Sequence, residues 1–138
     1  PGLECKRYGA LIDAAPIDLI CLGIGENGHL AFNDPPVADF ADLVSAKVVE
    51  LDRACREQQV NDGCFLRIED VPKHAITLTL PVFLRAKYLS VVVPGARKAD
   101  AVKRSVEGPL TTECPGSLLQ TRDRVTLFVD HDSASLLE

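Results

Sequence analysis

The sequence predicts an α/β fold whose sheet is mainly parallel. Short apolar or β-branched runs alternate with segments of helical spacing, and this element order is typical of such folds. A length of 138 residues suits one domain. Ligands bind beyond the carboxyl ends of parallel strands. The candidate site is therefore expected in the loops that follow strands, at residues 23–36, 94–98 and 130–133.

The elements up to residue 63 are expected to be the helix Glu4–Ala14, the strand Ile17–Leu22, the strand Lys47–Leu51 and a helix from Asp52 to about Val60. Pro16 ends the first helix, because a proline ring disrupts helical hydrogen bonding. Residues 17–22 form a nearly continuous apolar run, which indicates a strand covered on both faces. Asp52 is the expected cap of the second helix, and Asn61-Asp62-Gly63 ends it.

The elements after residue 63 are expected to be the strand His74–Leu80, a short helix opened by Pro81, the strand Tyr88–Val93, the helix Arg97–Glu107, the strand Val125–Val129 and a capped segment from Asp132 to Leu137. Residues 74–80 alternate and carry β-branched side chains, which favours a strand. Pro94-Gly95 ends the following strand. Apolar residues recur at helical spacing over residues 97–107, and Gly108-Pro109 stops that helix.

Composition and charge exclude several classes of function. The chain is 46% hydrophobic and 25% charged, with a net charge of −5, which disfavours an electrostatic nucleic-acid binder. Its longest apolar runs are too short to cross a membrane. Five cysteines form no C-x-x-C pair and three histidines are scattered, so we expect reduced thiols and no metal site. No signal segment follows Pro1, so we expect a cytoplasmic chain that begins inside a longer coding sequence or after processing.

The loop of residues 23–36 holds most of the chemistry in the sequence. Gly23, Gly25 and Gly28 spell G-x-G-x-x-G after an expected strand, as in dinucleotide-binding proteins. That fingerprint requires a helix at its end, with the pyrophosphate at the helix N-terminus. Pro35 and Pro36 follow within two turns and would break such a helix. The sequence therefore argues against NAD binding.

The same loop brings together the polar side chains of Asn27, His29 and Asp34, with Glu26 beside them. A neutral imidazole can pass a proton at physiological pH, and a nearby carboxylate can orient it. The flanking glycines allow a tight turn and close approach of a substrate. The alternative is a glycine-rich turn in which Asp34 is a cap and His29 is solvated. The residues alone leave both interpretations open.

Residues 23–35, G-I-G-E-N-G-H-L-A-F-N-D-P, resemble the signature G-x-G-x-D-G-H-[IL]-A-F-N-E-P of the glucosamine-6-phosphate deaminase (isomerase) family. The similarity extends to V-P-K-H-A-I-T at 71–77, P-G-A-R-K-A at 94–99 and V-E-G at 106–108, and covers about 17–134. It implies a Rossmann-like α/β sandwich. The related 6-phosphogluconolactonases typically continue T-A-S-L-F-P after the histidine, whereas here L-A-F-N-D follows. The deaminase branch is therefore favoured.

The resemblance implies roles for the residues of this loop. His29 would move a proton to and from the ring oxygen of a sugar, and Asp34 would orient its imidazole, although the family usually has the longer Glu there. Asn27 stands where the family usually has Asp. An amide cannot take up a proton at neutral pH, so a hydrogen-bonding role remains for Asn27, and Glu26 is a candidate substitute. Gly25 and Gly28 would line the substrate.

For the sugar phosphate, the resemblance implies Lys98 as a binding residue. A phosphate-binding arginine is usual in the helix that begins near Asp52; Gln59 stands at that position and Arg56 lies about one turn away. Arg56 is a candidate for the phosphate or for an ion pair with Asp52. The family's phosphate loop and its proton-abstracting aspartate precede the matched segment. Residues 1–138 are therefore expected to be a single partial domain, the C-terminal portion of a longer enzyme, inactive alone.

The expected reaction converts glucosamine 6-phosphate to fructose 6-phosphate and ammonia by acid–base aldose–ketose isomerisation, with a small-molecule sugar phosphate as substrate. It requires no metal and no organic cofactor. The alternatives are a 6-phosphogluconolactonase-like hydrolase and a catalytically inactive sugar-phosphate-binding domain, the latter because of Asn27. A homo-oligomer is possible, and neither nucleic acid nor membrane is an expected partner.

Overall fold

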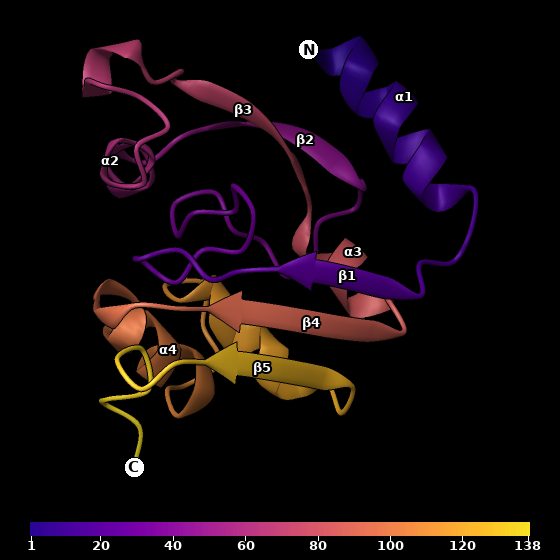
Figure 1. The fold of residues 1–138 in the computed structure, drawn as a ribbon. Helices are drawn as coiled ribbons and strands as arrows, with labels where there is room; N and C mark the ends of the chain where they lie inside the picture. Colours follow the sequence, from indigo (N-terminus) through magenta and orange to yellow (C-terminus); the bar gives the residue numbers. More distant parts are fainter.

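The computed structural model describes all 138 residues, and its centre is a parallel three-stranded sheet in the order β1-β4-β5 (Figure 1). The strands are β1 (Leu19–Leu22), β4 (Tyr88–Val93) and β5 (Val125–Val129). Because the three strands are parallel, their carboxyl ends lie at one edge of the sheet. The three loops expected to carry the site follow these strands and meet at that edge. The predicted α/β class and Rossmann-like arrangement are confirmed.

The other two strands form a separate antiparallel ribbon, so the sheet does not include every predicted strand. The ribbon pairs β2 (Ala46–Glu50) with β3 (His74–Leu78), Ala46 facing Leu78. The strand expected to reach Leu80 stops at Leu78, because α3 (Leu80–Arg85) begins with Pro81 in its first turn. Between the two strands lie α2 (Arg53–Asn61), capped by Asp52 as predicted, and the short 3-10 helix η1 (Ile68–Asp70).

The remaining helices are α1 (Gly2–Asp13), the 3-10 helices η2 (Ala96–Lys98) and η3 (Pro115–Thr121), and α4 (Ala99–Val106). The single helix predicted for residues 97–107 is thus divided into η2 and α4. The segment after β5 is a series of turns in which Asp130, rather than Asp132, accepts the backbone N–H of Ser133 at 2.8 Å. No helix has the length and apolarity needed to cross a membrane.

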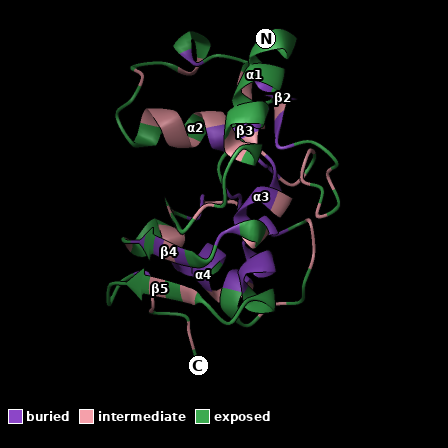
Figure 2. Ribbon diagram, turned by 90° about the vertical axis from the view of Figure 1, so that its right-hand side faces the viewer, coloured by how far each residue is buried: buried purple, intermediate pink, exposed green.

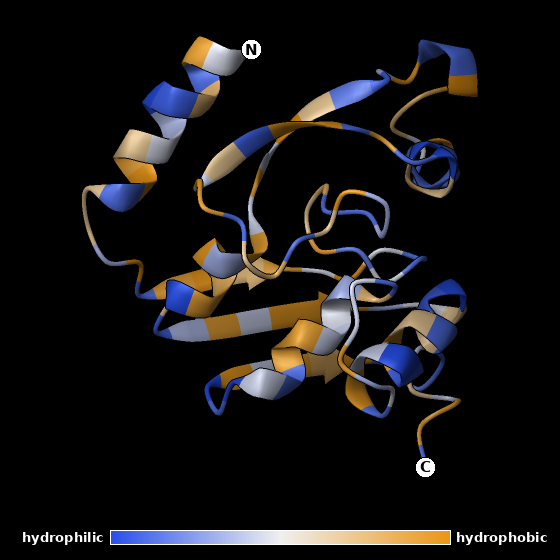
Figure 3. Ribbon diagram, turned by 180° about the vertical axis from the view of Figure 1, so that it is seen from behind, coloured by the Kyte–Doolittle hydropathy of each residue, from blue (hydrophilic) through white to orange (hydrophobic).

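The hydrophobic core lies on one side of the parallel sheet. Apolar side chains of β4 pack there against α3, α4 and η3, with Val91, Val102 and Leu118 among the buried residues. Buried residues are concentrated in these elements, whereas α1 is mostly exposed (Figure 2). The helices α3, α4 and η3 lie behind the sheet in Figure 1 and in front of it in the reverse view (Figure 3).

The other side of the sheet is uncovered, which corrects one prediction. The first strand was expected to be buried on both faces, yet Leu19 is 55% exposed. Its neighbours on this face include Tyr88, Val92 and Phe128, which are also exposed. The apolar composition of β1 is that of a strand with two covered faces, and the structure covers one of them.

The loop after β1 is fixed to the ribbon by the buried side chain of Asn33. Its Nδ2 donates hydrogen bonds to Leu30 O at 2.9 Å and to Leu78 O at 2.8 Å. Thr77 Oγ1 accepts from the backbone N–H of Phe32 at 3.1 Å. These bonds satisfy backbone groups in a segment that has no sheet partner, and they hold the loop over the end of β1.

We predict that Asn33→Asp lowers the free energy of unfolding by about 2–4 kcal/mol, because a carboxylate cannot donate to the two carbonyl oxygens and would be buried beside them. Urea unfolding measures the change. Asn61→Asp, at an exposed position at the end of α2, is the control and should change stability by less than about 0.5 kcal/mol. Equal effects of the two substitutions would contradict the role given to Asn33.

Candidate active site

The candidate site begins with a tight turn after β1. The backbone N–H of Gly25 bonds to His29 O, and that of Gly28 bonds to Gly25 O, both at 2.9 Å. Gly28 has a φ of 89°, which favours glycine. A Cβ on Gly25 would overlap the imidazole of His29. The two glycines therefore let the chain turn back and let the imidazole lie against the backbone.

The imidazole of His29 is almost fully buried, and its Nδ1 faces two oxygen atoms. Asn27 Oδ1 lies 2.7 Å from Nδ1, and Asp34 Oδ1 lies 2.9 Å from it. Both oxygens are acceptors, so Nδ1 carries the proton in the neutral ring. Nε2 forms no hydrogen bond within the chain, and its lone pair is the part of the ring left for a ligand.

The Asn27 amide connects three groups. Its oxygen accepts from His29, while its Nδ2 donates to Asp34 Oδ1 at 3.1 Å and to Asp52 Oδ2 at 3.4 Å. These partners fix the orientation of the amide, because only the nitrogen can face two carboxylates. Asn27 is thus placed to hold the imidazole, which is the hydrogen-bonding role expected from the sequence.

Asp34 is the buried acceptor at the centre of this network. Burial alone would raise the pKa of its carboxyl group. The hydrogen bond and charge of His29 oppose burial, and the Asn27 amide and the Asp52 backbone N–H add to them, so the pKa of Asp34 falls below its usual value. Asp34 therefore remains a carboxylate at neutral pH and keeps Nδ1 of His29 protonated.

A fourth group at Asp34 is the buried thiol of Cys55 in α2. Its sulfur lies within 4.8 Å of the nearest carboxylate oxygen, and burial together with the negative charge of Asp34 raises the pKa of Cys55 to about 12. No sequence pattern predicts that Cys55 or Asp52 belongs to the site. Both lie in a different element from the loop, and only the position of the N-terminus of α2 over Asp34 brings them there.

A pocket of about 280 Å³ opens beside His29. Its lining comes from the turn after β1, from α2 and from the end of β4, and comprises Gly23, Ile24, Gly25, His29, Ala31, Gln58, Val92, Val93, Pro94 and Lys98. It joins two of the three predicted loops. It also brings the imidazole and the Lys98 side chain to one hollow, as the sequence analysis expected.

Lys98 is positioned by the loop that follows β5. Asp130 accepts the backbone N–H of Gly95 at 2.9 and 3.1 Å and so fixes the turn that leads to Lys98. Burial lowers the pKa of Lys98, and the negative charges of Asp62 and Glu26 act in the opposite direction. A half-buried ammonium group in a pocket favours an anionic ligand, since such a ligand replaces lost hydration.

Three of the expected residues lie away from His29. The Glu26 carboxylate faces Arg97 at 3.4 Å instead of the imidazole. Gln59 does not line the pocket; its neighbour Gln58 does, and accepts the Glu26 backbone N–H at 2.9 Å.

Arg56 is occupied elsewhere. It donates to Ile68 O at 2.6 Å and Val71 O at 3.2 Å, and it forms no ion pair with Asp52. It lines a larger hollow of about 710 Å³ that contains neither His29 nor Lys98. The smaller pocket is therefore the candidate site, because it contains the imidazole of His29 and the ammonium group of Lys98.

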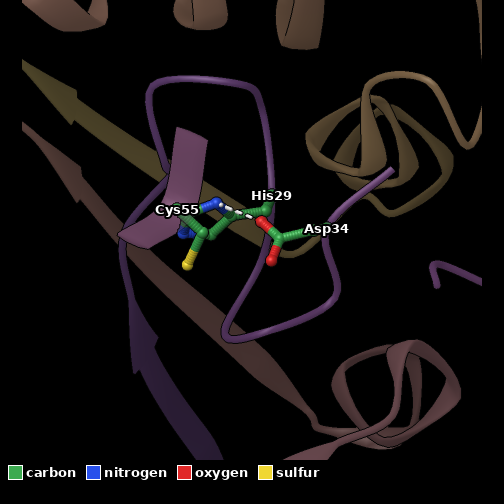
Figure 4. A group of neighbouring side chains, drawn as sticks. All are labelled: His29, Asp34 and Cys55. Carbon is green, nitrogen blue, oxygen red and sulfur yellow. Dashed lines mark ion pairs between the residues drawn. The ribbon is translucent and has the colours of Figure 1, made fainter. Parts of the chain in front are cut away.

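The site also contains three side chains that are common metal ligands. His29, Asp34 and Cys55 are all buried, and their ligand atoms lie within 4.8 Å of one another (Figure 4). The sequence predicts no such group, because the spacing of its cysteines and histidines matches no metal motif. The fold creates the group by placing α2 against the loop after β1.

Comparisons with known proteins agree with this geometry. Residues 2–128 match the family described as glucosamine-6-phosphate isomerases/6-phosphogluconolactonase. A glucosamine-6-phosphate deaminase of Bacillus cereus (strain G9842) is 42% identical over 133 residues, and one of Bacillus thuringiensis (strain Al Hakam) is 41% identical. Each alignment covers 96% of this chain and 49% of the relative, so the chain spans about half the length of these relatives.

Solved structures give the same result for the fold. A monomeric glucosamine-6-phosphate deaminase superposes with a TM-score of 0.90 at 34% identity, over 98% of this chain and 54% of that chain. The 6-phosphogluconolactonase from Leishmania guyanensis shares the fold, with a TM-score of 0.71 at 21% identity, over 97% of this chain and 52% of that chain. With the family match over residues 2–128, these similarities establish that the chain belongs to the glucosamine-6-phosphate isomerase/6-phosphogluconolactonase family.

Proposed function

We propose that this chain is the C-terminal half of an enzyme that converts glucosamine 6-phosphate to fructose 6-phosphate and ammonia. The observation that supports it most is the pairing of His29 and Lys98 in one pocket, an imidazole with a free Nε2 and a cation. The names and identities of the relatives favour deamination over lactone hydrolysis. A cytoplasmic location and a homo-oligomeric state remain predictions.

In this proposal His29 opens the sugar ring. Nε2 accepts the proton of the C1 hydroxyl and passes it to the ring oxygen as the bond between C1 and the ring oxygen breaks, while Asp34 and Asn27 hold Nδ1 and stabilise the imidazolium formed in between. Lys98 binds the 6-phosphate. The aldose–ketose shift moves a hydrogen from C2 to C1, and one water then replaces the nitrogen at C2 and releases ammonia. The base for the C2 proton would lie in the other half of the enzyme.

The uncovered face of the parallel sheet supports the proposal that this chain is one half of a larger domain. Parallel sheets occur almost only with both faces covered. Here Leu19, Val92 and Phe128 are each about half exposed on one face. A second layer over β1, β4 and β5 would bury these side chains and complete the two-sided arrangement.

We predict that the complete protein releases ammonia from glucosamine 6-phosphate and that the 138 residues alone do not, since the C2 base is expected outside them. An ammonia assay, with 6-phosphogluconolactone hydrolysis measured in parallel, checks this. Lactone hydrolysis without ammonia release would replace the proposal by the hydrolase alternative. Thermal stabilisation by glucosamine 6-phosphate with no turnover would support an inactive sugar-phosphate-binding domain.

We predict that His29→Asn in the complete protein lowers kcat by about 10²- to 10⁴-fold with little change in the melting temperature, because a positioned acid–base group contributes about this much. Steady-state assays and thermal melts measure both quantities. His131→Asn, at a fully exposed histidine, is the matched control and should keep full activity. Full activity in His29→Asn would remove the imidazole from the mechanism.

We predict that Asn27→Asp moves the acidic limb of the kcat/KM–pH profile to higher pH by about one unit. The change removes an N–H donor that lowers the pKa of Asp34 and adds a negative charge beside Asp34 and Asp52. Both effects raise the pKa of Asp34. A higher pH is then needed to reach the active form, in which Asp34 is a carboxylate. Ala10→Asp adds a negative charge at an exposed position of α1, which contributes no residue to the pocket, and it should leave the profile unchanged.

A further inference from the structure

The cluster of His29, Asp34 and Cys55 combines an imidazole, a carboxylate and a thiol in one buried place (Figure 4). We propose that this cluster binds a soft divalent metal ion such as Zn²⁺, and that the bound ion inhibits the enzyme. The binding part stands on the geometry of the cluster alone. The inhibition part rests on the proposed deaminase function.

The ligand types and their positions fit zinc. Zn²⁺ prefers imidazole nitrogen, thiolate sulfur and carboxylate oxygen, with bonds of about 2.0 Å to N and O and about 2.3 Å to S. In a tetrahedral site such bonds place the ligand atoms about 3.5 Å apart. The three atoms now lie within 4.8 Å, so side-chain movements of about 1 Å would close the site. The fourth position would be open to water.

Metal binding balances as an exchange of protons for the ion. In the metal-free chain Asp34 accepts the Nδ1–H of His29, and the neighbouring thiol of Cys55 carries its proton. On binding, Cys55 releases its proton to solvent and ligates as the thiolate, and the imidazole proton moves from Nδ1 to Nε2. Asp34 keeps its negative charge. A net charge of −1 from the three side chains becomes −2, which the divalent ion neutralises.

The same exchange explains why binding would inhibit. A metal on Nδ1 leaves the proton on Nε2, the atom that faces a ligand, and fixes it there. His29 could then no longer accept a proton from the sugar. Asp34 would be bound to the ion and would no longer support the imidazolium. Both changes remove the acid–base cycle while leaving the Lys98 side chain untouched.

Substitution of Cys55 separates metal binding at this cluster from metal binding by other cysteines of the chain. Cys55 is fully buried, whereas Cys64 is exposed after α2 and Cys21 lies on the uncovered face of the sheet, like Leu19. Neither of these two cysteines is part of the cluster. A substitution at Cys64 therefore provides the matched control for those at Cys55.

The test uses the complete, metal-free protein with Cys64 changed to serine and Cys21 changed to alanine, because a small apolar side chain suits the sheet face on which Cys21 lies. Cd²⁺ replaces Zn²⁺ as a spectroscopic probe, because a cadmium–thiolate bond gives an ultraviolet charge-transfer band. We expect one Cd²⁺ per chain to produce this band, and Cys55→Ser to abolish it. Cys55→Ala serves as a second variant if the serine protein does not fold, as judged by circular dichroism. A band of equal intensity in the folded Cys55 variants would overturn the proposal.

Inhibition is measured separately, and each variant is compared with its own metal-free rate. We expect Zn²⁺ to inhibit the parent protein and Mg²⁺ not to, and Cys55→Ser to raise the inhibitory Zn²⁺ concentration at least about tenfold. An unchanged inhibitory concentration would overturn the inhibition part. Since the Cd²⁺ titration needs no substrate, a protein without deaminase activity would refute the proposed function and still decide the metal site.

Discussion

The buried carboxylate of Asp34 is the constraint on which the rest of the site depends. A negative charge without water is stable only when donors surround it, and here His29, Asn27 and the backbone N–H of Asp52 supply them. Each donor comes from the loop after β1 or from the cap of α2, so the hydrogen bonds to Asp34 also connect these two elements. The orientation of the imidazole, with Nδ1 inward and Nε2 free, follows from the same arrangement.

The parallel sheet contributes by placing the loops that serve this charge and its expected substrate at one edge. The loop after β1 carries His29, the loop after β4 carries Lys98, and the loop after β5 holds Gly95 in place through Asp130. The third loop thus acts without entering the pocket. An anion bound at Lys98 would lie beside an imidazole whose proton position Asp34 has already set, which suits acid–base chemistry on a phosphorylated sugar.

Much of this was predictable from local sequence patterns, and the remainder depends on long-range packing. The apolar runs at β4 and β5 and the Asp52 cap needed only their own residues. The ribbon of β2 and β3, and the place of Cys55 beside Asp34, arise from contacts between distant segments, for which periodicity carries no signal. Gln58, rather than Gln59, lines the pocket, because successive residues of a helix point about 100° apart and the sequence pattern does not fix which of the two faces the pocket.

The chain departs from the usual family motif at two positions, with Asp34 in place of Glu and Asn27 in place of Asp, and the structure relates one change to the other. An aspartate is one methylene shorter than glutamate, yet Oδ1 of Asp34 lies 2.9 Å from Nδ1 of His29, while its Oδ2 accepts the backbone N–H of Asp52 at the start of α2. A carboxylate drawn toward α2 also comes near that of Asp52, and a third one at position 27 would repel both. The Asn27 amide instead donates to each and accepts from the imidazole. Asn27 thus adds no third negative charge beside Asp34 and Asp52. Asp34 can therefore remain a carboxylate and accept the Nδ1–H of His29.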